Sequence, residues 1–145
     1  MSTPAVSRPR KLLAEFAGTF AVVLVSAGAV CAAAYFGSGA QSAAAASLGA
    51  IQLGPLTAAI AYGVAYGAAV ATLGRISSGH FNPAVTIAHW ATHRFGPLDT
   101  LLYAAAQLGG ASAAAYSLRL AVPASAALGI AMPSSLPLLG PLSLA

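Results

Sequence analysis

The chain has 145 residues, of which 59% are hydrophobic and only 6% are charged, and its mean hydropathy is +0.83. Two acidic and six basic residues are too few to cover the surface of a soluble domain, in which about 25% of residues are charged. A disordered chain would be polar and charged. The composition therefore predicts a membrane protein, and one that is short for its class.

A small basic cluster near the N-terminus does not indicate a nucleic-acid partner. Arg8, Arg10 and Lys11 have no aromatic side chains interleaved with them, although the formal net charge of the chain is +4. Basic residues beside a membrane span are typical of its cytoplasmic end. We therefore interpret residues 1–10 as a cytoplasmic N-terminal tail and expect no nucleic-acid partner.

The first long apolar run predicts two membrane spans. No charged residue occurs between Glu15 and Arg75, and a helix needs about 20 apolar residues to cross the hydrocarbon core. We place a first span at 11–36, which is too long for the roughly 7–15-residue core of a signal peptide, and a second at 54–73. The uncharged segment 37–53, rich in Gly, Ser and Ala, predicts an outer loop.

Small residues mark the second and third predicted spans. Gly63 and Gly67 have the GxxxG spacing that lets helices approach in lipid, although alanine-rich helices also contain this pattern by chance. A third span is predicted at 97–120. The prolines of the tail, 121–145, argue against a fourth complete span.

The basic residues also predict the orientation of the spans. Five of the six precede the first span or lie between the second and the third, and only Arg119 falls on the other side. Cytoplasmic loops carry the excess of Lys and Arg. We therefore expect a cytoplasmic N-terminus and a location in the plasma (inner) membrane.

The segment 74–96 between the second and third spans predicts a re-entrant loop and half-helix. Asn82 is a good N-cap, and Pro83 is favoured at the first helical position. The sequence from Ala84 to about Arg94 is helical in character, and such a helix would cross little more than half a bilayer.

Backbone that is not helical is tolerated at membrane depth only where protein buries it or water reaches it. We therefore expect His80 and Phe81, which precede the half-helix, to line a wet path. The N-terminus of the half-helix would direct about half a positive charge toward the middle of the membrane. Such a site repels cations and orients water oxygens toward its donors.

Three motifs resemble one known family. Residues 78–86 (SGHFNPAVT), 13–20 (LAEFAGTF) and 106–111 (AQLGGA) are similar, in this order, to motifs of the aquaporins, the major intrinsic protein (MIP) family. The resemblance implies an all-α membrane protein with three transmembrane helices plus one re-entrant half-helix. This is one repeat of the aquaporin-like inverted-repeat fold.

The resemblance implies roles for four residues near the half-helix. Asn82, Pro83 and Ala84 would form the NPA box, in which the Asn82 amide donates to permeating water. His80 would add a polar lining beside the box. The implied activity is passive transport of water or small neutral solutes by a membrane channel.

The resemblance also implies a constriction and a brace. Tyr62 occupies the position of an aromatic residue of the outer constriction, where the family commonly has Phe or His, and an ordinary packing role stays open. Glu15 would brace the re-entrant loop by accepting backbone hydrogen bonds, or it would be an interfacial charge. Gln107 is predicted to hydrogen-bond between helices and support the same loop rather than touch solute.

No catalytic or metal-binding pattern accompanies these motifs. The three histidines are not paired with carboxylates, so no metal site is predicted. The sequence shows no nucleophile–base pairing and no cofactor fingerprint, and we expect neither an enzyme nor a cofactor.

A single NPA box leaves three interpretations open, because the family has two boxes and six spans. The chain is the N-terminal half of a truncated or partial channel, a half-channel that pairs with a second copy, or a non-conducting subunit that assembles with or regulates a full-length aquaporin. The expected partners are the lipid bilayer, water or small neutral solutes, and another copy, half or subunit.

Overall fold

The structure is a computed structural model, and it describes residues 6–37 and 53–121. Nearly all of the predicted outer loop and of the proline-rich tail lies outside the described residues, as do the first five residues of the N-terminal tail. The described part contains four helices and no strand: α1 (Arg8–Gly37), α3 (Leu53–Ser77), α4 (Pro83–Ala91) and α5 (Pro97–Ala121).

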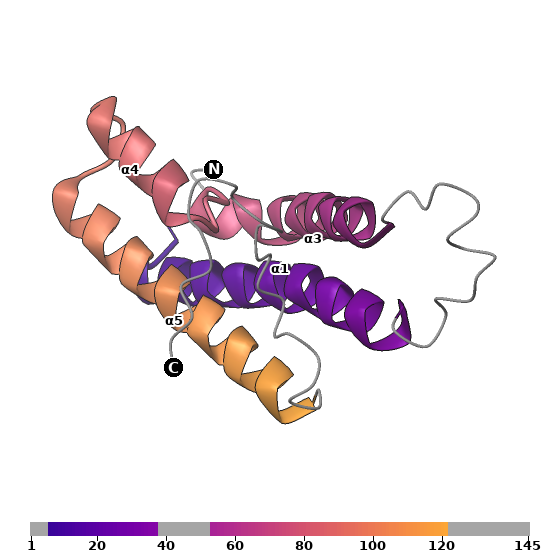
Figure 1. Ribbon diagram of the computed structural model, residues 1–145. Coiled ribbons are helices and arrows are strands. Elements are labelled where there is room, and N and C mark those ends of the chain that lie inside the picture. Colours follow the sequence, from indigo (N-terminus) through magenta and orange to yellow (C-terminus); the bar gives the residue numbers. More distant parts are fainter. Residues whose placement is uncertain (1–5, 38–52, 122–145) are drawn as a thin grey trace, which may run out of the picture.

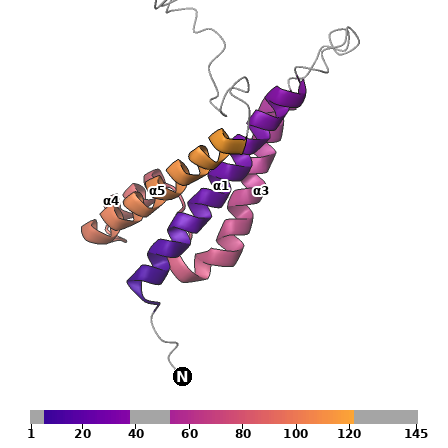
Figure 2. The same ribbon diagram turned by 90° about the horizontal axis from the view of Figure 1, so that it is seen from below.

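Helix α1 is the centre of the arrangement. It packs against α3 on one side and against α5 on the other, while α4 packs against α5. Figure 1 shows α1 and α3 side by side and running in opposite directions, and Figure 2 shows α5 leaving α1 at an angle on the side away from α3. The short α4 and the loop before it join the end of α3 to the start of α5.

Two glycines allow close contacts with α1. A Cβ atom on Gly110 of α5 would lie 2.3 Å from the carbonyl oxygen of Phe16, so the two backbones meet at this point. A Cβ atom on Gly18 would lie 2.2 Å from the ring of Phe81, so Gly18 makes the space in which this ring sits. By contrast, a Cβ atom on Gly63 or Gly67 would meet no atom of the described chain within 4 Å. The GxxxG pair therefore makes no helix contact in the described part.

The half-helix is shorter than the sequence predicts. Helix α4 has 9 residues, whereas the prediction continued it to about Arg94. Its end comes at Ala91, because the N–H of His93 donates to the carbonyl oxygen of Trp90 and the N–H of Arg94 donates to that of His89, both at 2.9 Å, which is the Schellman pattern of a helix C-terminus. His93 then adopts a left-handed conformation with φ of 57°, which a continuing helix does not permit.

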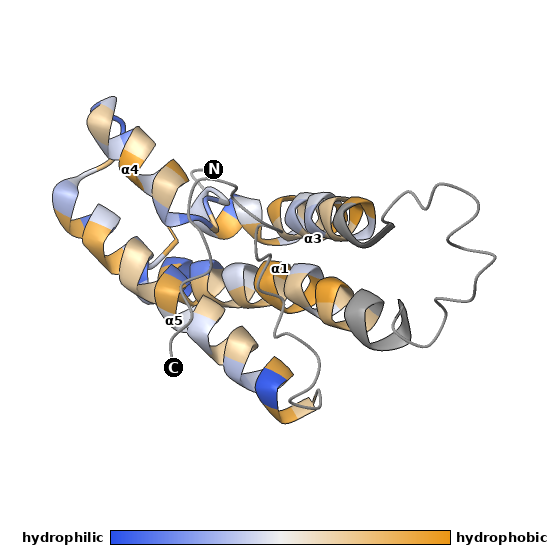
Figure 3. Cartoon of the chain, viewed as in Figure 1, coloured by the Kyte–Doolittle hydropathy of each residue, from blue (hydrophilic) through white to orange (hydrophobic). Residues whose placement is uncertain are grey.

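Polar residues lie inside the chain and large apolar residues lie outside. Glu15, Ser77, Thr86 and Gln107 are fully buried, whereas Leu13 and Val64 are both 67% exposed. The strongly hydrophilic positions gather near helix ends and around the loop before α4 (Figure 3). Two segments, Arg8–Ala32 and Leu56–Ser77, are long and apolar enough to cross a membrane, with hydropathies of 1.8 and 1.6. This inverted pattern suits a chain whose outer surface faces lipid.

Candidate pore-loop site

The loop between α3 and α4 has an unusual backbone. Ser78, Gly79 and Phe81 have φ values of 78°, 70° and 46°, in the left-handed region that favours glycine. A residue other than glycine held there costs of order 1–3 kcal/mol, and such residues persist only when the surroundings fix them. The contacts that fix this loop come from α1, α3 and α5.

The carboxylate of Glu15 is the main anchor of the loop. Its Oε1 accepts hydrogen bonds from the Ser77 hydroxyl at 2.6 Å and from the backbone N–H of His80 at 3.1 Å. Its Oε2 accepts from the backbone N–H of Phe81 at 2.7 Å and from Nε2 of Gln107 at 2.7 Å. The side chain is fully buried, and the four donors compensate the cost of removing its charge from water.

Gln107 links this anchor to the half-helix. Its Nε2 donates both to Glu15 and to the hydroxyl of Thr86, which lies at 3.0 Å on α4. The Thr86 hydroxyl donates in turn to the carbonyl oxygen of Asn82 at 3.2 Å. Thr86 was not among the residues predicted to have a role. Its position four residues after the N-cap, in an otherwise apolar half-helix, was the available signal.

Asn82 is the N-cap of α4, as the sequence predicts. Its Oδ1 accepts the backbone N–H of Ala84 at 2.8 Å, its backbone is extended, and Pro83 begins the helix. This bond orients the side-chain amide, because Oδ1 faces the helix and Nδ2 therefore faces away. No described residue accepts a hydrogen bond from Nδ2, and Asn82 is partly exposed. Its two amide hydrogens are thus available to a ligand.

The rings of His80 and Phe81 are buried, which differs from the prediction that they line a wet path. Both residues are 3% exposed. The imidazole of His80 stacks on His89, with ring centroids 4.4 Å apart, and its Nδ1 lies 3.1 Å from Oγ1 of Thr86. The ring of Phe81 fills the space over Gly18. The left-handed turn at Phe81 directs these rings into the chain, so the surface at this point is formed by Ser78, Asn82 and Ala84 instead.

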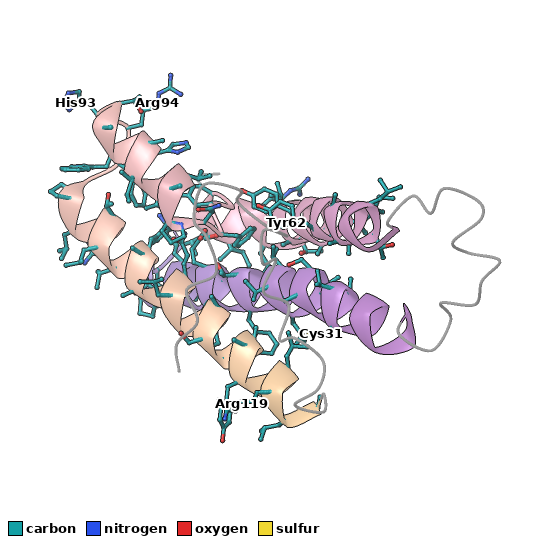
Figure 4. The ribbon with its side chains drawn as sticks, viewed as in Figure 1. Cys31, Tyr62, His93, Arg94 and Arg119 are labelled. Carbon is teal, nitrogen blue, oxygen red and sulfur yellow. The ribbon has the colours of Figure 1, made fainter. Side chains whose placement is uncertain are left out.

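A column of tyrosines connects the exposed face of α3 to the loop. Tyr62 is 44% exposed and stacks on Tyr66, with ring centroids 5.8 Å apart. The hydroxyl of Tyr66 donates to the carbonyl oxygen of His80 at 2.8 Å. Tyr62, labelled in Figure 4, thus lies one helical turn before the residue that contacts the loop. Tyr66 was not among the residues predicted from the sequence to contact the loop.

The C-terminal end of α4 and the first two turns of α5 carry the other polar groups. His93 and Arg94 project from the end of α4 that points away from the loop (Figure 4). The Tyr103 hydroxyl on α5 donates to the carbonyl oxygen of Ser77 at 2.9 Å and so ties the end of α3, where the loop begins, to α5. Within the described residues, no group of three or more His, Cys, Asp or Glu side chains is placed to hold a metal ion.

Comparison with known proteins identifies the family. The model of the family Major intrinsic protein matches residues 2–137. Aquaporin AqpM of Methanothermobacter thermautotrophicus is 39% identical over 115 residues, which cover 77% of this chain and 47% of the relative. Aquaporin Z of Photorhabdus laumondii is 38% identical over 107 residues, which cover 73% of this chain and 41% of the relative.

A plant relative, nodulin-26 of Glycine max, is 48% identical over 62 residues, which cover 43% of this chain and 23% of the relative. The matched part of the chain thus covers less than half the length of each of these curated relatives. Its all-α fold, with three long helices and one half-helix, corresponds to one aquaporin-like repeat of an integral membrane protein. The match over residues 2–137 shows that the chain belongs to the major intrinsic protein family.

Proposed function

We propose that this chain forms one wall of a membrane channel for the passive movement of water or small neutral solutes. The observation that carries the proposal is the capped amide of Asn82, whose Oδ1 is held by the backbone N–H of Ala84 at 2.8 Å. With Oδ1 committed to the helix, Nδ2 offers its hydrogens to an oxygen atom of a passing molecule. Two of the relatives named above, AqpM and aquaporin Z, carry the name aquaporin, which supports the same class of solute.

The electrostatics of the loop favour neutral solutes with an exposed oxygen. The N-terminus of α4 carries about half a positive charge and adds to the two amide hydrogens of Asn82. The negative charge of Glu15 is buried behind the loop and bonded to four donors. A molecule at Asn82 therefore meets donors and positive potential, which attract a water oxygen and repel a cation.

The second wall of the channel has to come from another half. The chain carries one NPA box, at 82–84, and the relatives are more than twice as long as the matched region. We propose that a second half, or a second copy, packs against the face of α3 that carries Gly63 and Gly67. This face is open in the described chain, since a Cβ atom on either glycine would meet nothing within 4 Å.

We further propose that the chain lies in the plasma (inner) membrane with its N-terminus in the cytoplasm. The orientation is supported by the basic residues, five of which lie near the N-terminus, in the last turn of α3 or between α4 and α5, on one side of the membrane. In this orientation His93 and Arg94, which follow the C-terminus of α4, would lie toward the cytoplasm. Tyr62 would form part of a constriction on α3, a role that its 44% exposure permits.

A second candidate function is supported by the burial of His80 and Phe81. Because both are 3% exposed, the polar side chains of the loop that reach the surface are those of Ser78 and Asn82. Such a wall would also suit a non-conducting subunit that assembles with a full-length aquaporin. Cross-linking and co-purification with such a relative, in proteoliposomes where this chain alone gives no permeability, would favour the subunit.

Stopped-flow shrinkage of proteoliposomes tests the channel. Asn82→Asp keeps the N-cap oxygen but replaces the two donor hydrogens by a negative charge. We expect wild-type protein to raise water permeability above that of protein-free liposomes and Asn82→Asp to abolish the increase. His93→Asn is the matched control, because His93 is exposed and asparagine tolerates its left-handed backbone. Background permeability for the wild type would contradict conduction by this chain alone.

A further inference from the structure

We infer that the cavity where α1 and α5 begin binds the phosphodiester headgroup of an anionic membrane lipid. The cavity has a volume of about 230 Å³. Its lining residues come from the start of α1, the loop after α4 and the first two turns of α5: Val6, Arg8, Lys11, Phe95, Asp99 and Tyr103. The inference does not depend on whether the chain conducts water.

The cavity contains basic side chains whose hydrogen-bond donors are not all used within the described residues. Nε of Arg8 donates to Oδ1 of Asp99 at 2.9 Å, an ion pair that ties the start of α1 to the start of α5. Because this bond uses Nε, both Nη groups of Arg8 are left as donors. Lys11 follows three residues later on the same helix face, and no described residue accepts a hydrogen bond from its ammonium group. These groups together are a donor set for phosphate oxygens.

The charge of the lining matches a phosphodiester. Arg8 and Lys11 contribute two positive charges and Asp99 one negative charge, so the lining has a net charge of one positive unit. A phosphodiester carries one negative charge, and its binding would neutralise the cavity. Asp99 opposes a more highly charged anion, such as the dianion of inorganic phosphate.

The remaining walls are aromatic and suit the glyceryl part of a lipid. The rings of Phe95 and Tyr103 pack together with centroids 4.8 Å apart. The hydroxyl of Tyr103 is committed to the carbonyl oxygen of Ser77, so Tyr103 presents its ring rather than a donor. The cavity volume is several times the share of about 30 Å³ that a water molecule occupies in the liquid, and it can hold more than a phosphate group.

The position of the cavity along α1 favours a lipid as the source of the phosphate. The apolar segment that can cross a membrane begins at Arg8, so Arg8 and Lys11 lie where the hydrocarbon core gives way to headgroups. Each Lys or Arg near such a surface contributes about 1 kcal/mol to attraction of anionic lipid, which corresponds to about a fivefold change in affinity.

Native mass spectrometry of the full chain in detergent, titrated with phosphatidylglycerol or phosphatidylcholine, tests the site. We expect one phosphatidylglycerol to be retained per chain, phosphatidylcholine to bind more weakly, and Lys11→Gln to weaken phosphatidylglycerol binding about fivefold. Arg10→Gln is the matched control, because Arg10 is exposed, has the same charge and does not line the cavity. Circular dichroism checks that each variant keeps its helical content.

Asp99→Asn separates ligand binding from a structural role of the ion pair. Asparagine keeps an oxygen that accepts from Arg8 Nε but removes the negative charge from the cavity, so phosphatidylglycerol should bind several-fold more tightly. Weaker binding by this variant would contradict the site, as would equal losses for Arg10→Gln and Lys11→Gln. Displacement of the lipid by millimolar inorganic phosphate would contradict a lipid site and indicate a site for a soluble anion.

Discussion

The interior between α1 and α5 and the outer face of α3 differ in the chemistry of the residues they present. Glu15 and Gln107 are fully buried in the interior, where each makes hydrogen bonds to other helices or to the loop before α4. On α3, Ile60 and Val64 are 58% and 67% exposed. Since lipid solvates apolar side chains, the polar interior carries the specificity of this fold and the apolar face is left for a partner or for lipid.

The largest expected effect on the free energy of unfolding is that of Glu15→Ala, which removes a carboxylate from the polar interior. It leaves the N–H groups of His80 and Phe81 and the side chains of Ser77 and Gln107 without their acceptor. Each unsatisfied buried group costs about 1–3 kcal/mol, so we expect the free energy of unfolding to fall by at least about 3 kcal/mol. Unfolding in mixed micelles, followed by circular dichroism, measures the loss.

The control for this variant is Val64→Ala on the exposed face of α3, where we expect a change within about 0.5 kcal/mol. If Val64→Ala destabilised the chain as much as Glu15→Ala, the distinction between the two regions would be wrong.

Three glycines sharpen the same comparison. A Cβ atom on Gly110 would lie 2.3 Å from the backbone oxygen of Phe16, so Gly110→Ala has to push α5 away from α1. We expect a loss of about 1–3 kcal/mol from this overpacking. Gly63→Ala and Gly67→Ala meet no described atom and should stabilise α3 by about 0.5–1 kcal/mol, because alanine favours helix.

The same unfolding measurement checks the glycine variants. The stabilisation is expected for the chain by itself, and a loss of stability at Gly63 or Gly67 that grows with protein concentration would support the second copy proposed for that face.

The tyrosine column provides a smaller test at the boundary between the two regions. Tyr66→Phe removes the hydroxyl that donates to the carbonyl oxygen of His80 at 2.8 Å, and we expect a loss of about 0.5–1.5 kcal/mol. Tyr62→Phe removes a hydroxyl that has no hydrogen-bond partner among the described residues, and it should be neutral. Equal effects of the two substitutions on the free energy of unfolding would exclude a role for Tyr66 in holding the loop.

The smallest effect is expected at the cap of the half-helix. Asn82→Ala loses the hydrogen bond from Oδ1 to the N–H of Ala84 and should cost about 1 kcal/mol, whereas Asn82→Asp should cost less because aspartate also caps helices. Circular dichroism and unfolding in micelles separate the two. A larger loss for Asn82→Asp would mean that the amide hydrogens, and not the cap, stabilise the loop.

Local chemistry made part of this fold predictable from the sequence. The apolar runs predict the long helices, and the pair Asn82 and Pro83 predicts where α4 begins, because capping depends only on adjacent residues. The end of α4 was harder to predict, since the helix ends at a left-handed His93, a conformation that the residue type does not signal.

The contacts of the site were less predictable because they join residues far apart in the chain. Glu15 meets Gln107 across 92 positions and the N–H of Phe81 across 66. The brace at Glu15 was expected only from family resemblance, and the parts taken by Thr86 and Tyr66 were missed. The inward direction of the His80 and Phe81 rings follows from the left-handed turn at Phe81, which the residue type alone does not signal.

The central claim is that the buried Glu15 carboxylate holds the loop before α4, and hydrogen–deuterium exchange at the backbone amides of His80 and Phe81 tests it most directly. The account predicts that both amides exchange slowly in the wild-type chain, because each donates to Glu15, at 3.1 and 2.7 Å. It predicts that both exchange rapidly in Glu15→Ala, while the amides of α3 keep their protection. Rapid exchange of these two amides in the wild type, or unchanged protection in Glu15→Ala, would contradict it.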